Sequence, residues 1–356
     1  DILARLHLKK GRKTFFVLNI TDIDDKIFDR AKKENLPYME IADRFYKSFV
    51  EDLDALNIET VSTFARVSNY VEESAALVKG LLDSGIAYKL GANVYFDTSK
   101  ADHFGKLSHQ GPHELRMKQI DAGPGKKNTV DFLLWRSVED ATEGVWNTAV
   151  GSGRPGWHIQ DSAIAFDEMQ GPYDLHGGAT ELIFPHHEAE LAQDETISGK
   201  IPFVKIWMHT GLFLKGQEKM SKSLGNVVTI KEAMKTFSAD EIRFHFLKHH
   251  YRDSLEYSPA SLNSSKAEFA VVKKAAVATP RSELKNNPQR ELGSAQLEKS
   301  RQEFVARMDD DLDTRGAISL LLSLSESIVN ENDPIKKAEA GQVFWDIAET
   351  LGFKLF

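Results

Sequence analysis

Apolar residues recur along this chain at spacings that indicate secondary structure. Two sets repeat every three or four residues: Ile41, Phe45, Phe49 and Leu53, and Val71, Ala75, Val78 and Leu82. This is the period of an amphipathic helix, so we expect two helices whose apolar faces pack on a core.

Short apolar runs predict strands. The run within 14–20 follows Gly11 and is continuously apolar at its centre, which is typical of a strand inside a parallel sheet. Thr21 then stands at the carboxyl end of that strand, where doubly wound sheets bind ligands, although Thr21 and Asp24 also match a helix-capping pattern. Two further runs within 86–97 are separated by a glycine-containing turn and predict a hairpin.

Composition narrows the class of protein. The chain has 356 residues, enough for more than one core, with 28% charged and 41% hydrophobic residues, as in ordinary globular proteins. It contains no apolar run long enough to cross a membrane and no basic-then-apolar leader, so we expect a cytoplasmic protein without membrane partners. The formal net charge of -8 means that a nucleic acid would need local basic patches. The absence of cysteine excludes disulfides and thiolate metal ligands.

Several short segments concentrate side chains that carry chemistry. They are GWHIQDS at 156–162, DLHGGATELIFPHHEAE at 174–190, WMH at 207–209 and EKMSKSLGN at 218–226. Lys219 and Lys222 suit a site that meets a triphosphate and neutralises charge as pyrophosphate leaves, although a solvated basic loop is the ordinary explanation of such a segment alone. Gly177 and Gly178 would let the backbone approach a ligand closely, or would form a plain turn.

Together and in this order, these segments resemble the cysteinyl-tRNA synthetases. KMSKS at 219–223 is the signature loop of class I aminoacyl-tRNA synthetases. The resemblance also covers LNITDIDDKI at 18–27, DFLLWR at 131–136 and HYR at 250–252, and thus nearly the whole chain.

The resemblance implies an α/β fold followed by helices. It implies a doubly wound parallel sheet, the Rossmann-type catalytic domain of class I synthetases, with a connective insertion, and then an all-α helical bundle. The implied domains are 1–97 for the first part of the catalytic domain, 98–154 for the insertion, 155–230 for the second half with the KMSKS loop, and 231–356 for the helical stem-contact and bundle domain.

The resemblance also implies a reaction and its partners. An amino acid, in this family cysteine, would be activated with ATP and Mg²⁺ to an aminoacyl-adenylate and passed to tRNA. Lys222 would be the catalytic lysine on the phosphates, supported by Lys219. The implied ATP-binding residues are His176, Gly177, Gly178, Trp207 and Lys222, and the implied amino-acid pocket is formed by Thr21, Trp157 and His158. A core position is the ordinary alternative for both tryptophans.

A metal site is the first point where this chain departs from the family. The family's zinc binds the substrate thiolate, and its histidine and glutamate ligands correspond to His186 and Glu190, which a helix would place on one face. Asp161 stands where the family has a cysteine ligand. Asp161, His186 and Glu190 either hold Zn²⁺ as a harder ligand set with an open position, or hold no metal, with Asp161 paired to a histidine. His187 points elsewhere on the helix, and we expect a structural role for it.

A second departure is that no His-x-Gly-His string occurs, although class I enzymes carry one at the first strand-to-helix turn. Matching the first residues to the family places that motif just upstream of Asp1, so we expect further residues there. Two alternatives to a tRNA ligase stay open. One is a catalytically degenerate paralogue with a binding or regulatory role, and the other is a ligase that joins cysteine to an amino sugar.

Overall fold

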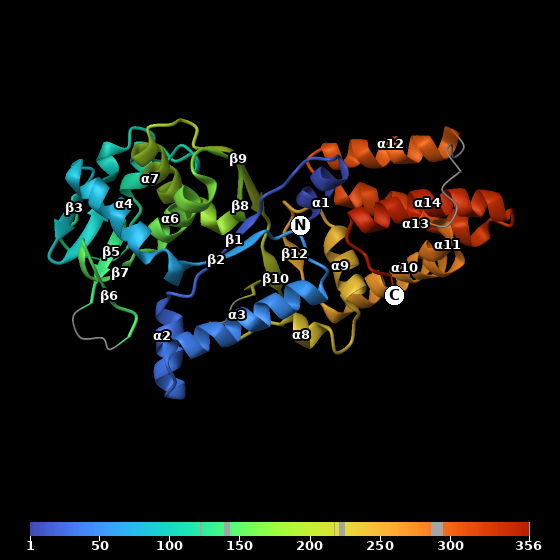
Figure 1. The fold of residues 1–356 in the computed structure, drawn as a ribbon, viewed down its shortest axis with the longest axis horizontal. Coiled ribbons are helices and arrows are strands. Elements are labelled where there is room, and N and C mark those ends of the chain that lie inside the picture. Colours follow the sequence, from blue (N-terminus) through green and yellow to red (C-terminus); the bar gives the residue numbers. More distant parts are fainter. Residues whose placement is uncertain (122, 139–142, 217, 221–224, 286–294, 356) are drawn as a thin grey trace. The chain divides into compact units, whose positions relative to one another are not determined.

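A computed structural model describes residues 1–356 except 122, 139–142, 217, 221–224, 286–294 and 356 (Figure 1). The chain forms two compact units, each assembled from separated segments. The α/β unit comprises Val17–Ser48 and Ser62–His209, and the helical unit comprises Asp1–Phe16, Phe49–Val61 and Thr210–Phe356. Among the described helices, none combines the length and the apolar character that crossing a bilayer requires.

The α/β unit contains a parallel strand pair and an antiparallel sheet. Its strands are β1 (Val17–Ile20), β2 (Thr63–Arg66), β3 (Ala87–Leu90), β4 (Asn93–Phe96), β5 (Leu133–Ser137), β6 (Trp146–Thr148), β7 (Gly151–Pro155), β8 (Tyr173–Ala179) and β9 (Val204–Thr210). β1 pairs with β2 in parallel, with Asn19 opposite Ala65, and β8 lies beside β9. The remaining strands form a five-stranded sheet in the order β3-β4-β5-β7-β6, whose pairs are all antiparallel. The hairpin predicted within 86–97 is β3-β4 and is confirmed.

The α/β unit also contains helices. They are α2 (Asp25–Glu34), α3 (Tyr38–Ala55), α4 (Val71–Asp83), α5 (Pro112–Arg116), α6 (Trp157–Met169) and α7 (Glu188–Ser198), with short turns η1 (Val67–Asn69), η2 (Thr98–Lys100), η3 (Thr180–Leu182) and η4 (Ile183–His187). α3 and α4 are the two helices predicted from apolar spacing. In α4 the spacing marks the core correctly, because Val71, Ala75 and Val78 are buried. In α3 the core assignment is wrong beyond Ile41: Phe45 is 39% exposed and lies under the guanidinium of Arg30.

Gly156 allows α6 to begin directly against β5. The N–H of Gly156 donates to the carbonyl of Leu134 at 2.8 Å, and a Cβ at residue 156 would lie only 2.0 Å from the carbonyl oxygen of Leu133. A side chain there would force the helix away from the sheet. The glycine therefore fixes where Trp157 and His158, in the first turn of α6, are presented.

α6 and α7 pack together and are buried along most of their length, polar residues included. Buried carboxylates need partners inside the protein. Glu188 finds them in the backbone, because its carboxylate accepts from the N–H groups of Gly105 at 2.8 Å and Ser108 at 2.7 Å. Other acids of these helices face side chains instead, and those acids form the site described below.

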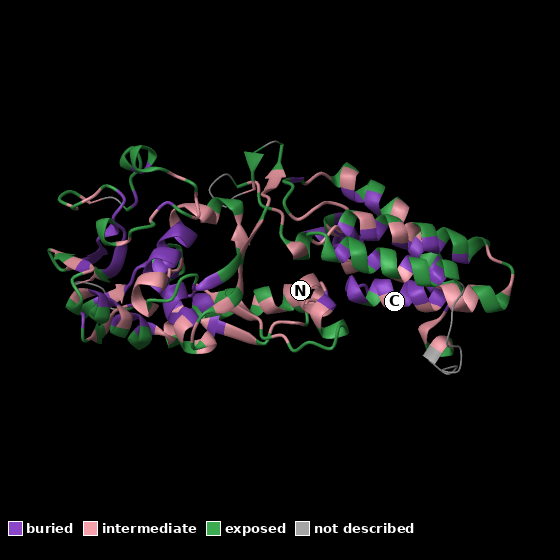
Figure 2. Cartoon of the chain, turned by 90° about the horizontal axis from the view of Figure 1, so that it is seen from above, coloured by how far each residue is buried: buried purple, intermediate pink, exposed green. Residues whose placement is uncertain are grey.

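The helical unit is an α-helical bundle with a small sheet. Its elements are α1 (Ile2–Lys9), the end of α3, β10 (Phe213–Lys215), β11 (Glu218–Lys219), α8 (Ile230–Ala233), α9 (Ala239–Leu247), β12 (Leu255–Glu256), α10 (Pro259–Ala278), α11 (Arg281–Lys285), α12 (Ala295–Asp309), α13 (Thr314–Asn330) and α14 (Pro334–Thr350). α10, α13 and α14 lie side by side around a core that includes Phe269, Leu321 and Phe344. Figure 2 shows buried and exposed residues alternating along these helices, as amphipathic packing requires.

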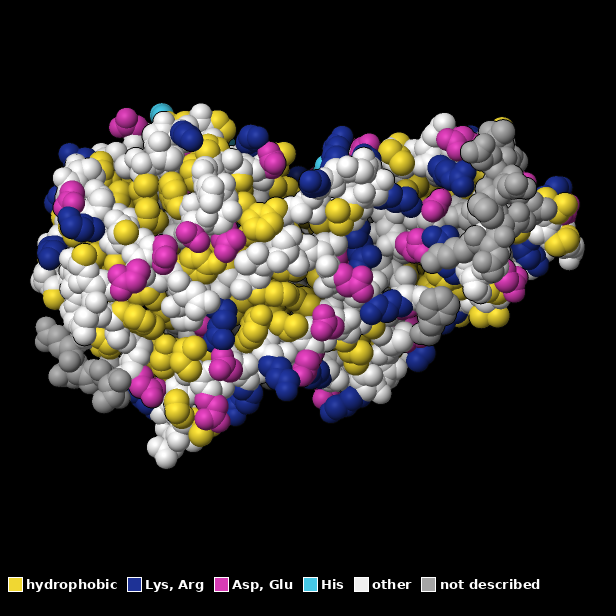
Figure 3. All heavy atoms as spheres, viewed as in Figure 1, with side chains coloured by type: hydrophobic (Ala, Val, Ile, Leu, Met, Phe, Trp, Pro, Cys, Tyr) yellow, Lys and Arg dark blue, Asp and Glu magenta, His cyan; other side chains and the backbone are white. Residues whose placement is uncertain are grey.

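The predicted helical second half is thus present, and beyond α11 residues 286–294 lie outside the described chain. The first strand begins at Val17, later than the expected 14–20, and Phe15 is 54% exposed. On the face shown in Figure 3, basic and acidic side chains are interspersed. The division into four domains by residue number stays a prediction.

Candidate active site

Three buried side chains of the α/β unit meet at the imidazole of His186. His186 lies in η4, Glu190 in the first turn of α7 and Asp161 in α6. Nε2 of His186 is 2.9 Å from Oδ2 of Asp161 and 2.8 Å from Oε1 of Glu190. The structure therefore brings together the three residues predicted as metal ligands.

The other faces of the His186 ring are also occupied. Nδ1 of His186 lies 2.8 Å from Nδ1 of His158, and the indole of Trp157 stacks on the ring with centroids 4.1 Å apart. The side-chain amide of Asn19, in β1, donates a hydrogen bond to Oδ1 of Asp161. Two predicted pocket residues, Trp157 and His158, thus contact a predicted metal ligand.

The two carboxylates favour the protonated form of His186 over that of His158. Burial opposes protonation of His186, but the negative charge of Glu190 and Asp161 outweighs it and raises the pKa of His186 to about 10. Burial, reinforced by the charge of His186, holds the pKa of His158 well below its usual value. Nδ1 of His186 therefore faces a neutral His158.

The donor set fits a divalent transition-metal ion. Oδ2 of Asp161 and Oε1 of Glu190 are buried, and neither has a hydrogen-bond donor of suitable geometry among the described residues. Both face the same Nε2, whose single N–H can point at only one of them. The three ligand atoms lie within 4.8 Å of one another, so one cation could satisfy all of them. Carboxylate, imidazole and carboxylate form a harder set than one with thiolates, but one that zinc accepts.

His176, Gly177 and Gly178 lie inside β8, rather than in a turn beyond it. Nδ1 of His176 is 2.6 Å from the hydroxyl of Tyr173, and its Nε2 is 3.3 Å from Oε2 of Glu190. The ring of Trp207 in β9 packs on His176 with centroids 4.8 Å apart. Two of the predicted ATP-binding side chains therefore contact each other and adjoin the Glu190 carboxylate.

His187 and His209 belong to the same cluster, which the motifs alone did not show. His187 is 1% exposed, and its Nδ1 lies 2.8 Å from Nε2 of His209. Burial, with the neighbouring charge of His176, lowers the pKa of His187 to about 2. The sequence contained one signal for His209: it is two residues from Trp207, and residues two apart on a strand lie on the same face.

Thr21 is the third residue predicted for the amino-acid pocket. It follows β1 and is half-buried. Asp24, rather than Thr21, caps α2, since its carboxylate accepts from the N–H of Lys26 at 2.7 Å. The residue of this segment that reaches Asp161 is Asn19, two residues before Thr21 and within β1.

A pocket opens beside Trp157 and His158. It is also lined by Arg136, Arg154 and Asp25, and Nη1 of Arg136 lies 2.9 Å from Oδ2 of Asp25. Arg154 forms a second ion pair with Asp25. The pocket therefore has charged side chains of both signs, paired with one another, next to the indole.

Lys219, one of the two predicted catalytic lysines, belongs to the helical unit. Lys219 lies in β11, opposite Leu214 of β10, and its side chain is exposed. The side-chain amide of Asn226 donates to the carbonyl of Lys219 at 3.2 Å, which closes the base of the loop. Lys222 lies outside the described residues.

Comparison with known proteins identifies the family. The model of the tRNA synthetases class I (C) catalytic domain matches residues 1–267. A cysteine–tRNA ligase of Dehalococcoides mccartyi is 36% identical, covering 100% of this chain and 77% of the relative. The cysteine–tRNA ligase of Staphylococcus carnosus is 36% identical over 98% of this chain and 76% of its own length. A methionyl-tRNA synthetase of Mycobacterium tuberculosis, solved with methionyl-adenylate, has a TM-score of 0.64 at 15% identity over 98% of this chain and 84% of that chain.

The last comparison shows the shared fold, and it confirms the expected α/β class with a following helical bundle. The first three show the family directly, because the match spans most of the chain. The chain therefore belongs to the cysteinyl-tRNA synthetases of class I.

Proposed function

We propose that this chain activates cysteine with ATP and transfers the cysteinyl group to tRNA. The observation that carries the proposal is the buried arrangement of Asp161, His186 and Glu190 beside Trp157. It occurs in a chain that aligns throughout with relatives named cysteine–tRNA ligases. A cytoplasmic location remains part of the proposal.

The reaction has two steps. A carboxylate oxygen of the amino acid attacks the α-phosphorus of ATP, the bond to the β-phosphate oxygen breaks, and pyrophosphate leaves with Mg²⁺. A ribose hydroxyl of tRNA then attacks the activated carbonyl and releases AMP. Both steps depend mainly on positioning and on stabilising charge at phosphate oxygens.

We assign nucleotide binding to β8 and to the lysine loop. His176 and Trp207 would flank the adenosine, and the backbone at Gly177 and Gly178 would approach it closely. At Gly177 a Cβ would meet no atom closer than 3.6 Å, so this part of the strand is accessible to a ligand. Lys222, supported by Lys219, would bind the phosphates and stabilise the departing pyrophosphate.

We assign amino-acid binding to Thr21, Trp157 and His158, and metal binding to Asp161, His186 and Glu190. A zinc ion held by these ligands would supply a Lewis acid for the substrate thiolate and thereby favour cysteine over serine. Around it, His158 keeps Nδ1 of His186 engaged, and Trp157 covers one face of the imidazole. Both contacts hold the His186 ring in a single orientation.

The test is ATP–pyrophosphate exchange by the full-length protein, with cysteine and serine compared. We expect exchange with cysteine, and a loss of about a hundredfold or more in Lys222→Ala, since removing a single group that stabilises transition-state charge has an effect of this size. Exchange that is absent with cysteine, or unchanged in Lys222→Ala, would contradict the proposal.

The acceptor is tested separately. The relatives above are named tRNA ligases, which favours tRNA over an amino sugar. Charging of tRNA by a protein that is active in exchange supports the proposal, whereas cysteine transfer only to an amino sugar overturns it. A catalytically degenerate paralogue would be inactive in both assays.

A further inference from the structure

A second group of potential ligands adjoins the first. His176, His187 and Glu190 each offer one ligand atom, and these atoms lie within 4.8 Å of one another. His187 and Glu190 are buried, and the side chain of His176 is 21% exposed. The group therefore lies at the edge of the buried cluster, where an ion could enter.

Each of the two histidines is oriented by a contact at its own Nδ1 atom. Nδ1 of His176 is 2.6 Å from the hydroxyl of Tyr173, and Nδ1 of His187 is 2.8 Å from Nε2 of His209. The other ring nitrogen, Nε2, is then the one that can face a metal ion, and Nε2 of His176 lies 3.3 Å from Oε2 of Glu190, the third member of the group. Histidines that bind metals in proteins are usually held in this way, with the second nitrogen engaged by a neighbouring group.

Glu190 faces both groups with different oxygens. Oε1 is 2.8 Å from Nε2 of His186, and Oε2 is 3.3 Å from Nε2 of His176. A carboxylate with one oxygen in each of two ligand groups can bridge two cations, as in known two-metal sites. Asp161 and His186 complete one group, and His176 and His187 complete the other.

Gly178 provides the space that His187 needs. A Cβ at residue 178 would lie 2.6 Å from Cε1 and 2.9 Å from Nε2 of His187, so any side chain there would displace this ring. The ring of Trp207 packs on both histidines, 4.8 Å from that of His176 and 5.2 Å from that of His187. His187 is thus confined by the backbone at Gly178, and both imidazoles are packed against one indole.

We propose that His176, His187 and Glu190 form a second site for a divalent transition-metal ion of the zinc or cobalt class, sharing Glu190 with the site of Asp161 and His186. Two imidazoles and one carboxylate select such ions over Mg²⁺ and Ca²⁺, which prefer oxygen ligands. Because two cations that share a carboxylate repel each other, the second ion binds more weakly than the first. His176 would offer Nε2 to this ion, and its ring would still flank the adenosine as assigned above.

The test is a Co²⁺ titration of the metal-stripped, untagged full-length protein, followed by cobalt absorption and by equilibrium dialysis. We expect two equivalents with separate affinities. His187→Gln should remove the weaker equivalent only, and Asp161→Asn, the matched control, should weaken the tighter one and leave the other. A single equivalent in the wild type, or two equivalents in His187→Gln, would overturn the proposal.

Tyr173→Phe keeps the test decisive if His187→Gln does not fold. It deletes only the hydroxyl on Nδ1 of His176, and we expect it to weaken the second site about tenfold, as the loss of a supporting contact does. Unchanged affinity in Tyr173→Phe would count against the second site. Because metal binding is counted without substrates, the result does not depend on whether cysteine is activated, and failure of either proposal can be recognised separately.

Discussion

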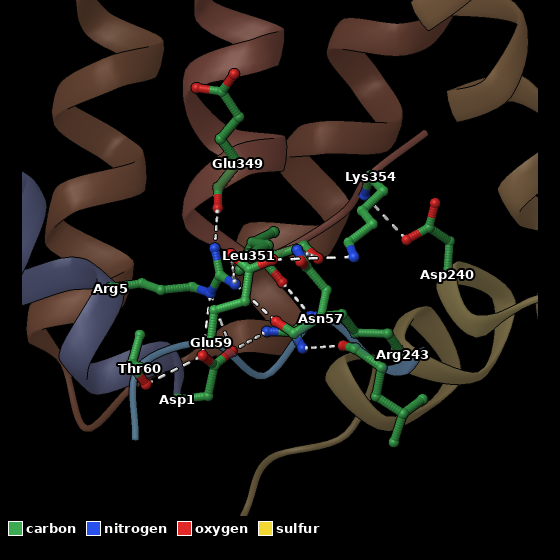
Figure 4. Close-up of polar contacts among 12 residues, drawn as sticks. Asp1, Arg5, Asn57, Glu59, Thr60, Asp240, Arg243, Glu349, Leu351 and Lys354 are labelled. Atoms are coloured by element: carbon green, nitrogen blue, oxygen red, sulfur yellow. Dashed lines mark hydrogen bonds and ion pairs between the residues drawn. The ribbon is translucent and has the colours of Figure 1, made fainter. Parts of the chain in front are cut away.

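The guanidinium of Arg243 is buried against the carboxylate of Asp1, to which its Nη2 donates a hydrogen bond (Figure 4). Its other nitrogens donate to backbone carbonyls, Nε to Leu351 at 2.5 Å and Nη1 to Leu56 at 2.8 Å. Burial, with the like charge of Arg5 nearby, lowers the pKa of Arg243 to about 10. One side chain of α9 thus joins three segments of the helical unit that are distant in sequence.

Arg243→Ala should therefore destabilise the helical unit strongly. The substitution removes the donor to two backbone carbonyls and one of the donors to the buried Asp1 carboxylate, to which Arg5 and Thr60 still donate. We expect a loss of about 3 kcal/mol in the free energy of unfolding. Chemical denaturation measures this. Arg252→Ala is the control, because Arg252 pairs with Asp311 at 2.6 Å but is 58% exposed, so its loss should be below about 1 kcal/mol. Equal losses in the two variants would contradict the assignment.

Two glycines should respond to alanine in opposite directions. At Gly156 a Cβ would lie 2.0 Å from a backbone oxygen of β5, so Gly156→Ala should cost about 2 kcal/mol or more. Gly80 lies within α4, where no atom is within 4 Å of an added Cβ, so Gly80→Ala should stabilise by about 0.5–1 kcal/mol through helix propensity. Thermal unfolding measures both effects: the midpoint should fall in Gly156→Ala and rise in Gly80→Ala. A shift of both midpoints in one direction would be inconsistent with this packing.

Local periodicity predicted the helices well but their burial less well. Four-residue spacing places His186 and Glu190 on one face because helix geometry alone decides it. The same spacing made Phe45 a core residue, yet Phe45 is exposed beside Arg30 and Arg44. Whether the apolar face of a helix is buried in a core depends on tertiary packing, and the spacing of residues along the chain gives no information about that packing.

The residues missed by sequence reasoning are those whose position depends on a neighbouring strand. His187 meets His176 and His209 because β8 and β9 lie side by side, which no local pattern states. Asn19 likewise reaches Asp161 from a strand that is distant in sequence. Family motifs recovered Trp157, His158 and Asp161 because they adjoin one another in one segment.

Asn19 should tune the affinity of the first metal site without being a ligand. Its amide fixes one oxygen of Asp161 and so orients the other toward His186. Asn19→Leu should weaken Zn²⁺ binding by about tenfold, as measured by competition with a chromophoric chelator. Asn147→Leu, at an exposed asparagine of β6, is the control and should bind as wild type does. The prediction is wrong if both variants bind zinc equally well.

His245 should make the helical unit sensitive to mild acid. This side chain is 2% exposed, and its Nδ1 lies 2.9 Å from the hydroxyl of Ser265. Burial, with His249 and then Lys248 nearby, lowers the pKa of His245 from 6.5 to about 4. Between these values the unfolded chain binds a proton that the folded chain does not, so the stability contributed by neutral His245 is complete above pH 6.5 and is lost as the pH falls toward 4.

The difference in unfolding free energy between pH 7.5 and pH 5 should therefore be smaller in His245→Gln than in wild type, by about 2 kcal/mol. Glutamine keeps a hydrogen-bonding side chain of comparable length but does not titrate, so the comparison isolates the proton. His113→Gln, at an exposed position of α5, should retain the wild-type pH dependence. If His245→Gln loses as much stability on acidification as wild type does, the acid sensitivity comes from another group, because the variant has no titrating side chain at this position.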